Sequence, residues 1–142
     1  MDKRDWRNDG VKVVRAADLQ RATAEGRGRA MAFDFASIGG SKVLMGTVSL
    51  PPNGRTGAHH HGTCNTAIYV TSGRSEIRWG EQLEYSAKIG QGDFVYFAPY
   101  VPHQEVNLDP DETLDLVVVR SEHFSFRADL HLEPIDHPEQ VY

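Results

Sequence analysis

Gly57-Ala58-His59-His60-His61-Gly62-Thr63-Cys64-Asn65-Thr66 places three consecutive histidines between two glycines, and Pro102-His103 follows later in the chain. Imidazole is the commonest metal ligand among protein side chains. Residues spaced two apart on an extended strand project to the same face, so His59 and His61 are predicted to converge while His60 points away. A third imidazole from a neighbouring strand, that of His103, would complete a three-nitrogen metal site with open positions for water or substrate.

The composition is that of an ordinary globular protein. The chain has 142 residues, of which 25% are charged and 39% hydrophobic, and this suits one domain with a real core. The formal charge of −5 argues against non-specific binding to nucleic acid or to an anionic membrane. No apolar run approaches the roughly 20 residues of a membrane span, and the first residues do not resemble a signal peptide. Because Cys64 is the single cysteine, no internal disulfide can form, and the cytoplasm is the expected location.

Around the histidines, the chain is expected to divide into an arm, one domain and a tail. Residues 1–10 are charged and are expected to form an N-terminal arm. Residues 11–127 are expected to form the single domain, which begins with a short strand and a short helical segment at residues 11–14 and 16–25. Residues 128–142 are expected to form a C-terminal tail that is loose in its last part.

From residue 30 onward, apolar and polar residues alternate with a period of two, which is typical of β-strands. Strands separated by glycine and proline turns are predicted at residues 32–35, 42–50, 67–71, 75–79, 83–89, 93–97 and 114–120. Many short strands at regular spacing indicate an all-β sandwich or barrel. Phe124 and Phe126 would belong to a further edge strand. Gly73, Gly90 and Gly92 are expected at turns that need a positive φ.

The segment around His59 and His61 resembles the first sequence motif of the cupin family, and the segment around His103 resembles the second. In the first cupin motif, a glycine and a His-x-His pair are followed by a glutamate and a closing glycine. Residues 57–73 resemble this motif and carry His59-x-His61, and residues 92–107 resemble the second motif and carry His103. The resemblance implies a double-stranded β-helix, which is a small jelly-roll barrel with a metal inside its open end. In this chain, the barrel would have a short N-terminal helix and strands in addition.

The chain departs from the first motif at the fourth ligand. Thr66 stands where a cupin of the common type has its glutamate, or Asn65 does if the gap is counted as three residues. Neither side chain competes well with water for a divalent metal. Cys64 remains an alternative fourth ligand, and a thiolate would favour zinc or copper. The metal ligands implied are therefore three histidines without a carboxylate, namely His59, His61 and His103.

Two side chains near the ligands are candidate catalytic residues. Glu105 lies two residues after His103 on the same extended segment, so it is expected to face the interior and to shuttle a proton or orient a ligand. A salt bridge at the rim is the alternative role. Tyr96 is the second candidate, with core packing as its alternative. Tyr100 stands where the second motif normally has glycine, and Asn107 is expected to hold backbone at a turn.

The ligand set narrows the function. Three neutral imidazoles leave a divalent metal with its full charge, which favours a small anionic chelating substrate. Three-histidine cupins include iron dioxygenases acting on diketones and thiols, so the resemblance implies a mononuclear non-haem Fe(II) dioxygenase. Fe(II) is the favoured cofactor, and Zn, Ni, Mn and Cu are alternatives. The alternative functions are a non-redox isomerase, cyclase or lyase, a hydrolase, and a non-catalytic small-molecule-binding protein.

The expected macromolecular partner is a second copy of the chain. Small single-domain cupins often pair by packing of sheets or by exchange of terminal strands, and residues 11–35 offer such a segment. We therefore expect a homodimer, with no nucleic acid and no membrane partner.

Overall fold

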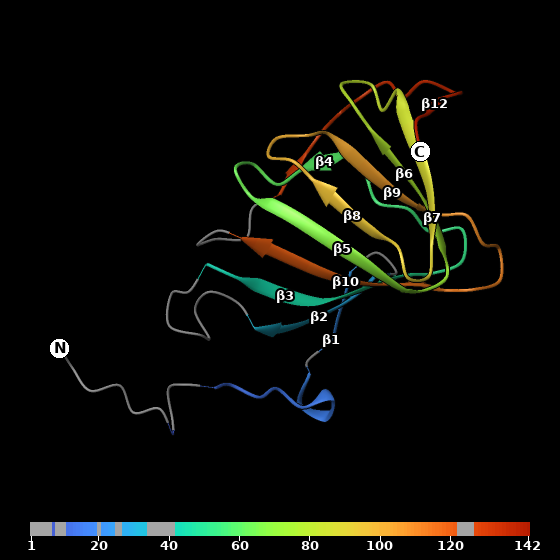
Figure 1. Ribbon diagram of the computed structural model, residues 1–142. Coiled ribbons are helices and arrows are strands. Elements are labelled where there is room, and N and C mark those ends of the chain that lie inside the picture. The colour runs from blue at the N-terminus through green and yellow to red at the C-terminus, as the bar shows by residue number, and fades with distance from the viewer. Residues whose placement is uncertain (1–6, 8–10, 20, 25–26, 34–41, 122–126) are drawn as a thin grey trace.

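Alternating strands build the molecule from two six-stranded sheets (Figure 1). The computed structural model describes residues 7, 11–19, 21–24, 27–33, 42–121 and 127–142. The first sheet consists, in order, of β1 (Arg21–Ala24), β2 (Arg27–Phe33), β3 (Leu44–Leu50), β10 (Leu114–Ser121), β5 (Asn65–Ser72) and β8 (Phe94–Phe97). The second consists, in order, of β11 (Ala128–Asp129), β4 (His59–His60), β9 (His103–Asn107), β6 (Arg74–Trp79), β7 (Tyr85–Gly90) and β12 (Glu139–Gln140). The predicted all-β fold is confirmed.

The core lies between the two sheets and is built from the inward-facing residues of the alternating strands. Every second residue of β10 is buried, beginning with Leu114. The same alternation places Ile68 and Val70 of β5 inside. Burying one such aliphatic side chain stabilises the fold by about 1.5–3 kcal/mol. The core cluster consists of Leu50, Ile68, Val70, Ile77, Phe97, Leu114, Leu116 and Val118.

The N-terminal segment differs from the prediction. Residues 11–14 form no strand, and Val11 and Val13 are 79% and 63% exposed. The expected helical segment shrinks to one turn of 3₁₀-helix, η1 (Ala16–Asp18), and β1 follows it. Pairing of β1 with β2 overrides the weak helix propensity of these residues. No helix in the described part of the chain has the length and hydropathy of a membrane span.

The C-terminal segment is not loose, so that expectation was wrong. β11 pairs with β4, and β12 pairs with β7 in the one parallel pairing among the described strands. The backbone amide of Leu130 also donates to the carbonyl of Ala58 at 2.9 Å. These pairings place the segment at both edges of the second sheet. Backbone ladders need no hydrophobic pattern, so the side chains of this segment did not predict them. Phe124 and Phe126 lie outside the described residues.

Two of the three predicted turn glycines have a positive φ. The angle is +89° at Gly73, which joins β5 to β6, and +91° at Gly92, but Gly90 does not have one. At Gly73 an added Cβ would lie 2.8 Å from the carbonyl oxygen of Thr113. A side chain therefore fits this turn poorly for two reasons, backbone conformation and space.

Candidate metal centre

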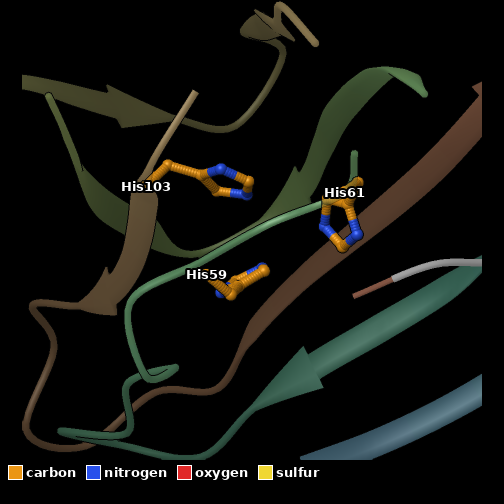
Figure 2. Close-up of side chains that lie close together, drawn as sticks. All are labelled: His59, His61 and His103. Carbon is orange, nitrogen blue, oxygen red and sulfur yellow. The ribbon is translucent and has the colours of Figure 1, made fainter. Parts of the chain in front are cut away.

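Three buried histidines converge inside the molecule (Figure 2). His59 of β4 lies directly opposite His103 of β9 in the antiparallel ladder, and His61 follows β4. Their exposed fractions are 3%, 1% and 6% for His59, His103 and His61. One nitrogen from each ring lies within 4.8 Å of the other two. The predicted convergence of the three imidazoles is therefore present in the fold.

Backbone carbonyls orient two of the rings. The carbonyl of Gly57 lies 2.8 Å from Nδ1 of His59, and that of Val101 lies 3.0 Å from Nδ1 of His103. A carbonyl only accepts, so each Nδ1 carries the proton and each Nε2 keeps its lone pair. Histidines that bind a metal through one ring nitrogen ordinarily donate the N–H of the other to such a partner.

The protonation states also suit metal binding. Burial is the main cause that lowers the pKa of His59 to about 3, and the charge of His103 adds to it. Burial likewise lowers the pKa of His103, although the charge of Glu105 opposes this shift. Both imidazoles are therefore neutral at neutral pH, which is the form that binds a metal.

Several buried polar atoms at this site have no hydrogen-bond partner among the described residues. They are His103 Nε2, Thr66 Oγ1 and Arg120 Nε. Thr66 lies beside Arg120 in the pairing of β5 with β10, and opposite Phe97 of β8, whose ring stacks on His103 at 4.2 Å. Buried polar groups are rarely left unpaired. The donor set of three neutral nitrogens therefore fits a divalent metal ion with a polar ligand beside it.

Arg120 is the residue of this site that the sequence analysis missed. It occupies the last buried position in the alternation of β10, after Leu114, Leu116 and Val118, and is 8% exposed. Its Nη2 donates to Nε2 of His61 at 3.2 Å. The signal was present in the sequence, because the period of two that buries Leu114 also turns Arg120 inward.

Glu105 faces the interior, as expected. Its ladder partner on β6 is the buried Ile77, and its charge reaches His103, whose pKa it raises against the effect of burial. The hydroxyl of Thr56 donates to Glu105 Oε2 at 3.1 Å and holds the carboxylate in place. Glu105 does not belong to the group of ligand atoms formed by the described residues. Its position suits proton transfer or orientation of a ligand.

Tyr96 lies away from the histidines. It is 63% exposed on β8, next to the inward-facing Phe97, and its hydroxyl donates to Asn65 Oδ1 at 2.6 Å. The alternation of β8 explains this placement, because Thr66 and Phe97 face the interior while their neighbours in sequence face outward. The structure therefore does not bring Tyr96 and Asn65 to the candidate metal centre.

Two other residues near the histidines are not part of the ligand group. The ring of His60 lies 5.7 Å from that of Tyr100, and the amide of Gly62 donates to its Nδ1 at 3.0 Å. His60 thus points away from the cluster, as predicted. Cys64 is buried, but its sulfur is not among the grouped ligand atoms of the described residues.

The loop before His103 keeps a glycine-like backbone. Tyr100 has a φ of +61°, in the left-handed region that glycine adopts most easily. Its amide donates to the carbonyl of Gly62 at 2.8 Å, which ties this loop to the end of the histidine stretch. The tyrosine therefore adopts a backbone conformation that glycine reaches more easily, at some cost in backbone energy.

A cavity of about 690 Å³ is lined mainly by residues of β6, β7 and β8, among them Tyr96, and by none of the three histidines. Its lining includes Phe97, which stacks on His103, and Trp79, the ladder partner of His103. Ile77, Ala87 and Val101 add apolar surface to the same lining. The cavity therefore offers apolar space for part of an organic molecule bound next to the metal centre.

Solved structures similar to this chain share its fold at low sequence identity. The polyketide cyclase RemF from Streptomyces resistomycificus is 21% identical, with a TM-score of 0.69 over 87% of this chain and 89% of that chain. Oxalate decarboxylase from Bacillus subtilis is 19% identical, with a TM-score of 0.70 over 86% of this chain and only 34% of that chain. An oxalate oxidase bound to the substrate analogue glycolate is 19% identical, with a TM-score of 0.65 over 77% and 57%.

The sequence comparisons identify the family. Curated protein sequences give no match to this chain. The family model described as Cupin domain matches residues 46–120, a span that contains all three histidines and ends at Arg120. This match and the shared double-stranded β-helix agree with the two motifs around His59 and His103. The chain belongs to the cupin domain family.

Proposed function

We propose that His59, His61 and His103 bind one divalent metal ion and that the protein is an enzyme acting on a small anionic substrate. The reaction we favour is that of a mononuclear non-haem Fe(II) dioxygenase. The observation that supports this most directly is the convergence of three buried imidazoles, with Nε2 of His103 lacking any hydrogen-bond partner among the described residues. A neutral ligand set leaves the charge of the metal available to an anion.

Each residue around the metal has a distinct role in this proposal. When bound, the metal supplies Lewis acidity and, as Fe(II), reactivity with O₂. Glu105, held by Thr56, accepts a proton from the substrate. The ring of Phe97, which stacks on His103, shields this side of the reacting group from bulk water. The cavity that Phe97 also lines provides room for an apolar part of the substrate.

A non-redox cyclase or isomerase is the second candidate. RemF, described as a polyketide cyclase, is matched over most of both chains, whereas oxalate decarboxylase is matched over one third of its length. A cavity of about 690 Å³ is also larger than a two-carbon acid requires. The same residues serve this reaction, because Glu105 would move a proton while the metal polarises a carbonyl or enol group.

The first experiment measures metal content. We expect about one divalent metal ion per protomer in protein purified without a histidine tag, determined by elemental analysis, from the three-ligand site. His59→Ala, His61→Ala and His103→Ala should each lose the metal while keeping the circular-dichroism spectrum of a β fold. His60→Ala is the matched control, because its ring points away from the cluster and should leave metal content unchanged. Full metal content in any two of the first three variants would contradict the assignment.

The second experiment separates the two reactions. The iron-loaded protein is screened in an oxygen electrode against β-diketones, thiol carboxylates and catechol-like or enol substrates. Substrate-dependent O₂ uptake that is lost in His103→Ala supports the dioxygenase. If no uptake occurs and the zinc or nickel form cyclises or isomerises one of these substrates, the non-redox reaction replaces it.

A further inference from the structure

We propose that Arg120 binds the anionic group of the substrate beside the three histidines, and that this makes metal and anion bind cooperatively. The inference deepens the proposed function and rests on it for the location of the metal. The anion that the geometry favours is a carboxylate, since the planar guanidinium fork matches two carboxylate oxygens.

Arg120 is held inside the molecule by its place in the sheet. In β10 it pairs with Leu44 of β3 on one side and with Thr66 of β5 on the other, so the centre of the first sheet fixes its backbone. The side chain is 8% exposed, and Nε has no hydrogen-bond partner among the described residues. Taking a guanidinium out of water is costly unless its donors are satisfied. A ligand that accepts from Nε would remove this cost.

The position of Arg120 relates it directly to the metal ligands. Its Nη2 donates to Nε2 of His61 at 3.2 Å, and this nitrogen has one lone pair. A metal that takes this lone pair takes the acceptor of Arg120 away at the same time. Because a metal bound to this nitrogen would occupy the place of Nη2, the guanidinium would have to move aside, and its two donors Nη2 and Nε would then both need an acceptor. A carboxylate bound to the metal would accept from both.

Among the described residues, no carboxylate is ion-paired with Arg120, although the charge of Glu105 acts on it. Burial and the neighbouring charge of Arg29 lower its pKa to about 10, so it stays positive at neutral pH, while Glu105 and Cys64 act in the opposite direction. The carboxylate of Glu105 accepts instead from the hydroxyl of Thr56. Arg127, which also lowers the pKa of His59, is ion-paired with Asp129 at 2.7 Å. Arg120 therefore places a positive charge beside the histidines before a metal enters.

This arrangement predicts cooperativity between metal and anion. A divalent ion next to a buried guanidinium is repelled by it, and the repulsion is strong because the interior screens charge poorly. An anion between them interacts favourably with both. Metal binding should therefore tighten in the presence of a carboxylate, and by thermodynamic reciprocity carboxylate binding should tighten in the presence of metal.

The test measures cobalt(II) affinity by calorimetry with acetate as the anion and perchlorate at equal ionic strength as its control. For the unmodified protein, acetate should tighten Co²⁺ binding by about tenfold, within the usual range of coupling between two sites. Arg120→Met keeps the length of the side chain and removes its charge. This variant should bind Co²⁺ more tightly than the unmodified protein and show no acetate effect, which a purely structural role of Arg120 would not produce. Arg74→Met removes an exposed arginine far from the ligands and should behave like the unmodified protein.

A second measurement tests whether Arg120 binds an anion when no metal is present. The Nε–H resonance of Arg120 is followed by nuclear magnetic resonance in unmodified, chelator-treated protein during titration with acetate, and it is expected to shift. If Co²⁺ binds but acetate changes neither its affinity nor this resonance, the inference is wrong and the metal centre stands. If no metal binds but the resonance shifts with acetate and not with perchlorate, the proposed function fails and Arg120 remains an anion-binding residue. If neither occurs, both are wrong.

Discussion

Glu105 is the residue that we propose moves a proton beside the three histidines, because its charge acts on His103 while Thr56 holds its carboxylate. Glu105→Gln keeps the shape of the side chain but removes its ability to accept a proton. We expect kcat to fall by about 10²–10⁴-fold while metal content stays unchanged. The matched control is Glu76→Gln. Glu76 lies on β6, the strand next to that of Glu105, and is ion-paired with Arg78 of the same strand. A loss of metal equal to that of the histidine variants would instead make Glu105 a ligand.

Thr66 has the position of the usual cupin glutamate, and its buried Oγ1 has no hydrogen-bond partner among the described residues. We expect Thr66→Val to keep full metal content and to raise the free energy of unfolding of chelator-treated protein by up to about 1 kcal/mol, because it removes a buried unpaired hydroxyl. Thr66→Glu should tighten metal binding, since it adds a charged ligand. Elemental analysis and urea unfolding measure the two effects. Loss of metal in Thr66→Val would contradict the three-histidine site.

His59 and His103 make stability depend on pH. Burial lowers the pKa of both in the folded state, to about 3 for His59, whereas the pKa of an unfolded histidine is about 6.5. The unfolded state therefore binds more protons below pH 6.5, and folding stability should fall as the pH drops from about 6.5 towards 3. Urea unfolding of chelator-treated protein across this range measures the slope. The double variant His59→Gln/His103→Gln should show a shallower slope, and an equal slope would contradict the assignment.

Asn107 is the residue that ties the elements around the site together. It is 2% exposed, and its Nδ2 donates to the carbonyls of Leu50, Pro51 and Glu112 at 2.8 to 3.2 Å. It therefore holds the end of β3 and the turn before β10 against β9, which confirms its predicted role in holding backbone. The strand that carries His103 depends on these bonds for its position.

Asn107→Asp tests this role. The substitution replaces a donor with a buried carboxylate facing three carbonyl oxygens, so we expect the free energy of unfolding to fall by about 2–4 kcal/mol at neutral pH. Asn65→Asp is the control, because Asn65 is exposed at the start of β5. Urea unfolding measures both variants. Equal stability of the two would show that the bonds of Asn107 contribute little.

The inner strands of both sheets could be predicted from the sequence. Each of them buries one face in the core, and this dictates the alternation of apolar and polar residues. The same period places Glu105 on the side of His103, and it also predicts Arg120 inside and Tyr96 outside. The pairings of β1, β11 and β12 could not be predicted, since edge ladders are made by the backbone and leave no pattern in the side chains. The shape of the Tyr100 loop was also hidden, because a non-glycine residue adopts a left-handed conformation there.

At the scale of the whole molecule, the N-terminal segment presents apolar side chains that the described chain does not cover. Figure 1 shows residues 11–19 running outside the two sheets. Val11 and Val13 lie on either side of Lys12 and are 79% and 63% exposed, as in a strand that lacks a neighbour. β1 ends the first sheet in the described structure, so one side of its ladder is open. An open edge of this kind is a template for another strand.

We propose that the protein is a homodimer in which residues 11–14 of each copy add a strand to the first sheet of the other. The exposed valines would then lie against the partner, which explains an extended segment that forms no ladder with the described residues of its own chain. Sedimentation velocity at about 100 μM protein should show a dimer, and dilution should shift it towards the monomer by mass action. The double variant Val11→Asp/Val13→Asp should be monomeric with an unchanged circular-dichroism spectrum, because charge at these positions opposes burial. Leu108→Asp, which changes an exposed apolar residue in the turn after β9, should remain dimeric. A monomer in the unmodified protein, or a dimer that survives the double variant, would overturn the exchange of this segment.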